Sequence, residues 1–150
     1  SYDAKNGWKS LISQLTQHVA RNGRVGTRHI IDHGRPGVQS IGPAVPITVE
    51  QFGELLRLRL IDSGTTIVLH GCEVADLSTG VEYCQSIANI TGTKVVANVD
   101  CMWIRGLDDF RGVGWKMERG PLNGEIFPTA WIGGTRAFYP NKAHFGAWRN

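Results

Sequence analysis

Two short apolar runs each end in a residue that can do chemistry beside a glycine. They are Ile30-Ile31-Asp32-His33-Gly34 and Ile67-Val68-Leu69-His70-Gly71-Cys72. A histidine next to a cysteine can form a nucleophilic dyad, because the imidazole takes the thiol proton or stabilises the thiolate. The carboxyl ends of parallel strands meet at one edge of a sheet, where open α/β folds place their sites. We therefore predict that His33 and Cys72 meet at such an edge.

The residues around these runs predict an α/β fold. Helices are expected where apolar residues recur at helical spacing before a stop signal, and strands where β-branched residues run together. The alternation of the two along the chain makes parallel strand pairing the default. The expected helices cover residues 8–21, 48–61 and about 78–91, the expected strands cover 28–32, 65–69 and 94–99, and a loop is expected over 34–46.

The chain is expected to form one domain over residues 1–150, a length that buries a core without metals or disulfides. The core of that domain is expected over about residues 8–107. After Leu107 the pattern changes to short strands or turns, which predict a small β appendage over about residues 108–150. These short elements are expected at residues 115–118, 126–127 and 135–139.

Composition narrows the classes of function. The net charge is only +3 and the basic residues are scattered, which argues against a nucleic-acid partner. No stretch approaches the roughly 20 apolar residues that a membrane span needs. The first residues hold no apolar signal-peptide core. No glycine-rich nucleotide motif follows a strand, and no cofactor is expected.

Cysteine number and spacing give three further expectations. Cys72, Cys84 and Cys101 are an odd number without a CxxC pair, which argues against a disulfide framework and a metal site, and favours a reducing compartment. Cys84 is expected to pack inside its helix, and Cys101 to be structural. Among the other candidates, His29 is expected at the surface or in a turn.

The strand-end motifs belong to a longer ordered pattern. It consists of His33-Gly34-Arg35-Pro36-Gly37, Gly71-Cys72-Glu73-Val74-Ala75, Gly80, Ile87-Ala88, Thr91-Gly92 and Val95-Val96-Ala97. The pattern resembles the caspase-like cysteine peptidases of clan CD, and more closely a bacterial caspase-like domain of uncharacterised function in large surface proteins. Residues 96–103 and 138–140 are also similar to the C-terminal domains of Rhs-type polymorphic toxins. The resemblance implies a three-layer caspase-like fold with a mostly parallel sheet flanked by helices.

The same resemblance assigns roles to individual residues. Cys72 becomes the nucleophile and His33 the general base or acid, with the Gly34 and Cys72 amides as oxyanion donors. The position two before the nucleophile commonly lines the substrate pocket in this clan, and here it is His70. Acidic residues near the same edge are further pocket candidates, namely Asp32, Glu73 and Asp100.

Three hypotheses about function follow. The first is a cysteine endopeptidase, the toxic effector portion of a larger secreted bacterial protein, with a protein or peptide substrate and an immunity or inhibitor protein as a further partner. The second is a caspase-like binding or surface-display module whose dyad is silent, since a fold does not fix a function. The third is a toxin that uses the thiol for non-proteolytic acyl or amide transfer.

Overall fold

The structure is a computed structural model, and it describes residues 7–42, 45–100 and 134–141. Its helices are α1 (Gly7–Asn22), α2 (Val49–Arg57) and α3 (Leu77–Thr91). Its strands are β1 (Gly26–Ile30), β2 (Gly34–Arg35), β3 (Val38–Gln39), β4 (Thr65–Leu69), β5 (Lys94–Asn98) and β6 (Thr135–Phe138).

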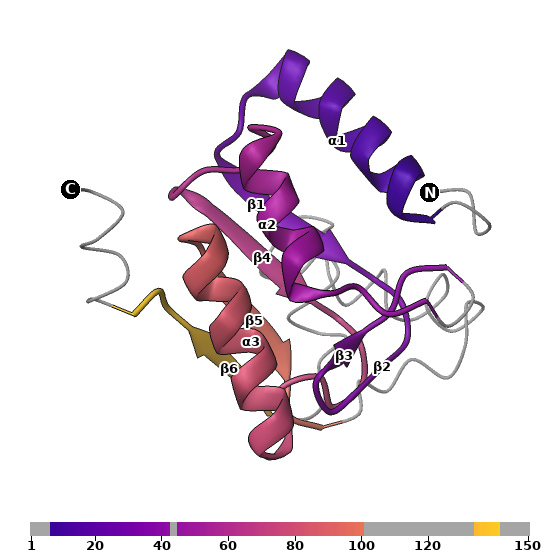
Figure 1. Cartoon of the computed structure of the whole chain (residues 1–150), viewed down its shortest axis with the longest axis vertical. Coiled ribbons are helices and arrows are strands. Elements are labelled where there is room, and N and C mark those ends of the chain that lie inside the picture. Colours follow the sequence, from indigo (N-terminus) through magenta and orange to yellow (C-terminus); the bar gives the residue numbers. More distant parts are fainter. Residues whose placement is uncertain (1–6, 43–44, 101–133, 142–150) are drawn as a thin grey trace, which may run out of the picture.

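The main sheet has the strand order β1-β4-β5-β6. β1 pairs with β4 and β4 with β5, both in parallel, whereas β6 runs antiparallel to β5. Helices α2 and α3 lie side by side across this sheet, and α1 lies beyond α2 (Figure 1). The predicted α/β class, a mostly parallel sheet flanked by helices, is therefore confirmed.

Local signals explain where the helices begin and end. Thr48 caps α2 by accepting a hydrogen bond from the Gln51 amide, and the Gln51 side chain accepts one from the Thr48 amide. Helix α3 ends at Gly92, which adopts the left-handed conformation with φ of 69°. Strand β5 begins two residues after Gly92 and pairs in parallel with β4, so both strands enter the sheet from the same side.

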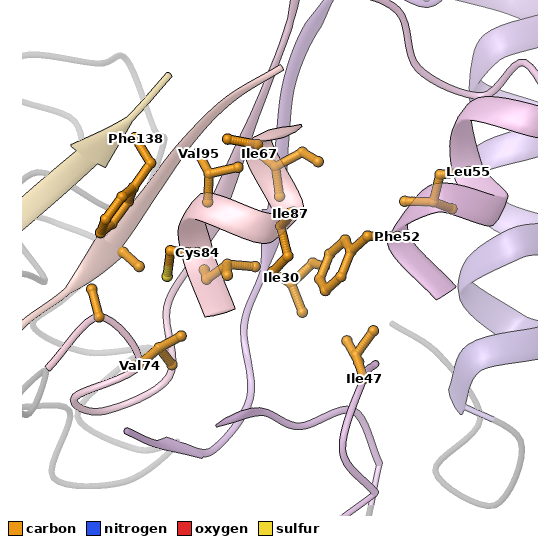
Figure 2. Packing of buried hydrophobic residues seen from close by; sticks show 14 of the residues in the cluster. Ile30, Ile47, Phe52, Leu55, Ile67, Val74, Cys84, Ile87, Val95 and Phe138 are labelled. Atoms are coloured by element: carbon orange, nitrogen blue, oxygen red, sulfur yellow. The ribbon is translucent and has the colours of Figure 1, made fainter. Parts of the chain in front are cut away.

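One apolar cluster joins the sheet to α2 and α3 (Figure 2). Ile67 and Val95 are paired neighbours on β4 and β5, and both are buried against the helices. Phe52 of α2 is fully buried, and its ring meets the edge of Tyr83 of α3 at a centroid distance of 6.5 Å. This cluster fixes the helices on one face and leaves the carboxyl ends of the strands to the loops.

Three sequence-based expectations need correction. Strand β1 ends at Ile30, so Asp32 lies beyond it rather than inside it. The expected loop over residues 34–46 contains the β2–β3 hairpin, which was missed because each of its strands has only two residues. Residues 135–138 form β6 of the main sheet rather than part of a separate appendage, because they pair with β5. The expected elements at residues 115–118 and 126–127 lie outside the described residues.

Within the part of the chain that the structure describes, none of the helices combines the length and apolar character that crossing a membrane requires.

We predict that Phe52→Ala lowers the free energy of unfolding by about 3–5 kcal/mol, because it removes a fully buried ring and leaves a cavity. Denaturant unfolding followed by circular dichroism measures the change. Leu58→Ala, at a residue that is 49% exposed just after the same helix, is the control and should cost far less. Equal losses for the two variants would contradict the packing described above.

Candidate active site

The strands that precede His33 and Cys72 are direct neighbours in the sheet. β1 and β4 pair in parallel with Ile30 opposite Leu69. The pairing extends one step further, because the His70 amide donates to the Ile30 carbonyl at 2.9 Å. The prediction that both strands end at one edge of a parallel sheet is therefore confirmed, and the two strands are in addition direct neighbours.

The turns that follow the two strands touch through their glycines. A Cβ atom added to Gly34 would lie 2.8 Å from the Gly71 Cα, and one added to Gly71 would lie 2.8 Å from the Gly34 Cα. Carbon atoms do not approach this closely without displacement, so glycine is required on both sides. Each of these glycines is bonded to a dyad candidate, Gly34 to His33 and Gly71 to Cys72, so the contact brings the two candidates to one place.

The β2–β3 hairpin holds the His33 turn in position. Pro36-Gly37 forms its turn, and Gly37 has a φ of 76°, as expected of a Pro-Gly pair in a type II turn. The Ser40 amide donates to the His33 carbonyl at 2.9 Å, and the Gly37 amide donates to the Val74 carbonyl at 3.0 Å. The hairpin is thus hydrogen-bonded both to the residue before Gly34 and to the turn after Cys72.

Gln39 bridges the two turns and was not identified from the sequence. Its side chain is fully buried. Its Oε1 accepts from the Gly71 amide at 2.9 Å, and its Nε2 donates to the Ser40 carbonyl at 3.1 Å and to the His33 carbonyl at 3.5 Å. Nothing in the sequence singles out Gln39, because residues 34–46 were expected to form a loop.

Hydrogen bonds from the end of β5 hold the Cys72 turn in position. The buried Asn98 donates from Nδ2 to the carbonyls of His70 and Gly71, each at 3.3 Å. The Glu73 amide donates to the Asp100 carbonyl at 3.1 Å. Glu73 itself has a φ of 58°, an uncommon conformation for a residue with a side chain, and such conformations cluster at functional sites.

The two dyad candidates differ in exposure and in chemical state. His33 is exposed, while Cys72 is half-buried. Cys72 is disulfide-bonded, whereas Cys84 is free. The sequence argued against a disulfide framework and did not predict this bond at Cys72, because pairing depends on distance in the fold and not on CxxC spacing. Cys84, the other described cysteine, is not its partner.

The acidic pocket candidates are placed by backbone hydrogen bonds. Asp32 accepts from the His33 amide at 2.6 Å and from the Gly42 amide at 2.8 Å, so its carboxylate shapes the loop around His33. Asp100 is exposed and its Oδ2 accepts from the Gly134 amide at 3.0 Å. Glu73 is half-buried directly after Cys72. The three lie near the same edge, and their role in a substrate pocket remains a prediction.

His70 and His29 form a pair that the sequence did not reveal. His29 Nδ1 and His70 Nε2 are 2.9 Å apart, and His70 is only 1% exposed. The expectation that His29 is a surface or turn residue is wrong, since it lies half-buried in β1. Burial, and secondarily the neighbouring His29, lowers the pKa of His70 to about 3. His70 is thus a neutral buried residue here, and its place in a substrate pocket remains a prediction.

A separate groove of about 560 Å³ lies between α1 and β1. Its walls are mainly apolar, with Leu15 of α1 and Leu55 of α2 among them. His33 and Cys72 are not among the residues that line it. The groove is therefore distinct from the edge at which the turns of His33 and Cys72 lie.

The remaining candidates are Cys84, a metal site and Cys101. Cys84 is fully buried in α3, as expected, and this burial raises the pKa of its thiol to about 12. Among the described ranges, no group of three or more histidine, cysteine or acidic residues could hold a metal ion. Cys101 lies outside these ranges.

We predict that the His29–His70 pair destabilises the protein in acid. The unfolded chain binds a proton at His70 near pH 6.5, whereas the folded chain does so only near pH 3. This contribution to stability is complete above pH 6.5 and is lost as the pH falls toward 3, on the order of 5 kcal/mol in total. His70→Gln should flatten the slope of unfolding free energy against pH by up to about 1.4 kcal/mol per unit.

Denaturant unfolding between pH 3.5 and 7.5 measures this slope. His18→Gln is the control, because His18 is exposed on α1. Identical slopes for His70→Gln and the unsubstituted protein would show that His70 titrates normally in the fold.

Comparison with known proteins identifies a family. A family model described as "Domain of unknown function (DUF4347)" matches residues 4–122. No curated protein and no solved structure matches the chain. The matched range includes both strand-end turns and all described elements except β6.

Proposed function

The chain belongs to the family of domains of unknown function DUF4347, and from its site we propose that it is a cysteine endopeptidase with Cys72 as nucleophile and His33 as general base. One observation carries this proposal. The parallel pairing of β1 with β4 brings the His33 and Cys72 turns into contact through Gly34 and Gly71. Two reactive side chains held at adjacent strand ends match the arrangement that α/β sites use.

The proposed reaction begins with the reduced thiol of Cys72. His33 takes the thiol proton, and the sulfur attacks the substrate carbonyl carbon, so that a C–S bond forms and the carbonyl electron pair moves to oxygen. The amides of Gly34 and Cys72 bind this oxyanion. When the tetrahedral intermediate collapses, the C–N bond breaks and His33 returns the proton to the leaving amine. Water then hydrolyses the thioester, with His33 as base.

The surroundings of the site favour a polypeptide substrate. His33 and Asp100 are exposed and Cys72 is half-buried, so a chain lying across the edge can reach the thiol. Carboxylates near the thiol suit a basic substrate side chain. We propose a protein or peptide substrate on these grounds, and an effector role within a larger secreted protein on the resemblance to toxin domains.

A second candidate function rests on the disulfide at Cys72. A sulfur held in a disulfide is not a nucleophile, and disulfides persist in oxidising compartments such as cell surfaces. In this candidate Cys72 is a structural half-cystine in a binding or surface-display module. The reduced protein distinguishes the two candidates, because only the peptidase gains a reactive thiol on reduction.

We predict that the reduced protein contains a thiol at Cys72 that iodoacetamide alkylates rapidly at pH 6–7. Free cysteine has a pKa near 8.5, and a neighbouring imidazole lowers it. His33→Ala should slow this alkylation by about tenfold or more in that pH range. Peptide mapping by mass spectrometry assigns the adduct to Cys72 rather than to the other two cysteines.

His18→Ala is the matched control, because it removes an exposed histidine that lies on α1 and not in either strand-end turn. It should leave the alkylation rate unchanged. If Cys72 reacts like an ordinary thiol in the reduced protein, with or without His33, the dyad does not exist.

We predict that Cys72 resists alkylation until dithiothreitol reduces its disulfide, while the fold persists after reduction. The dithiol supplies two electrons and becomes oxidised as the S–S bond becomes two thiols. Alkylation and peptide mapping before and after reduction measure the first point, and thermal unfolding measures the second. A structural disulfide instead predicts a stability loss of about 2–4 kcal/mol on reduction and no reactive thiol, which would favour the display module.

A further inference from the structure

Two buried polar side chains, Gln39 and Asn98, contact the two peptide groups that the proposed function assigns to oxyanion binding. Asn98 is 2% exposed, and Gln39 is fully buried. Burying an amide is unfavourable unless its hydrogen bonds are satisfied, so the contacts of these two side chains are informative. Among the described residues, these contacts go to backbone groups of His33, Ser40, His70 and Gly71.

Asn98 fixes the peptide that joins Gly71 to Cys72. Its Nδ2 donates to the Gly71 carbonyl at 3.3 Å from the buried side. In a trans peptide the C=O and the following N–H point in opposite directions. Because the Gly71 carbonyl is held toward the buried Asn98 side chain, the Cys72 N–H points away from Asn98.

The peptide that joins His33 to Gly34 is oriented in the same way, by hydrogen bonds to its carbonyl. The His33 carbonyl accepts from the Ser40 amide at 2.9 Å and from Gln39 Nε2 at 3.5 Å. This carbonyl therefore points toward β3, and the Gly34 N–H points away from β3. Gln39 also ties the two turns together, since its Oε1 accepts from the Gly71 amide at 2.9 Å.

We propose that Gln39 and Asn98 are positioning residues that aim the amide hydrogens of Gly34 and Cys72 at the substrate oxyanion. This inference rests on the proposed function and adds two residues to it. Neither side chain touches the substrate, and each acts by holding a carbonyl on the opposite side of an oxyanion-binding peptide. The proposal explains why a glutamine and an asparagine are buried beside two glycine turns.

The test separates oxyanion binding from thiol reactivity. Acylation of the reduced protein by p-nitrophenyl acetate passes through an oxyanion, whereas alkylation by iodoacetamide displaces iodide and forms none. Asn98→Leu, which keeps the branched shape but removes the amide, should slow Cys72 acylation by about 10- to 100-fold, because a donor misplaced by about 1 Å loses most of its effect. The alkylation rate should stay within twofold.

Gln39→Met is the second variant and should show the same split, so the test survives if Asn98→Leu fails to fold. Thr93→Val is the matched control. Thr93 is fully buried, and its hydroxyl lies 2.8 Å from that of Thr91. It directly precedes the start of β5, whereas Asn98 is the last residue of that strand. It should lose stability without changing either rate.

The outcomes are distinguishable. If the unsubstituted protein is acylated no faster than Cys72→Ala, the proposed function fails. If Cys72 is acylated normally in both folded variants, or if acylation and alkylation fall together, the positioning role is overturned while the dyad stands. A selective loss of acylation in either folded variant supports the proposal.

Discussion

The parallel pairing of β1 with β4 is the constraint on which the rest of the site depends. With Ile30 opposite Leu69, strands β1 and β4 end at the same level of the sheet, and each is followed by a turn. Their turns then pack so closely that glycine is required at both Gly34 and Gly71. A shift of this register by one residue would move every side chain of one strand to the other face and would separate the two turns.

Buried polar groups stabilise this arrangement more specifically than the apolar core does. The core packs α2 and α3 onto the sheet, and it sets the distance between layers. The direction of individual peptides at the strand ends is set instead by Gln39, Asn98 and the hydroxyl of Tyr83, which donates to the Ile47 carbonyl at 2.6 Å and accepts from the Gln39 amide. Hydrogen bonds have direction, whereas apolar contacts do not, so polar side chains are suited to this task.

Much of the fold was predictable because its signals are local. The β-branched runs at residues 65–69 and 94–98 became β4 and β5, and Gly92 ended α3 as its type suggested. The β2–β3 hairpin was missed because two-residue strands carry no periodicity, although Pro36-Gly37 is a turn signal. The antiparallel pairing of β6 with β5 could not be foreseen, since 36 residues separate Asn98 from Thr135 in the sequence.

The candidate site was predictable only in part. The proximity of the His33 and Cys72 turns followed from strand order, because parallel neighbours end together. The roles of Gln39, the His29–His70 pair and the disulfide at Cys72 did not follow. All three depend on which side chains the fold brings together from distant positions, and a single sequence carries no record of such distances.

The most direct test of the central claim is peptide cleavage by the reduced protein. The protein is incubated with a peptide library derived from a proteome, and new peptide termini are identified by mass spectrometry, with Cys72→Ser as the reference. We expect new termini in the unsubstituted sample that share a preferred residue before the cleaved bond and that are missing with Cys72→Ser. Identical peptide sets in the two samples would contradict the claim.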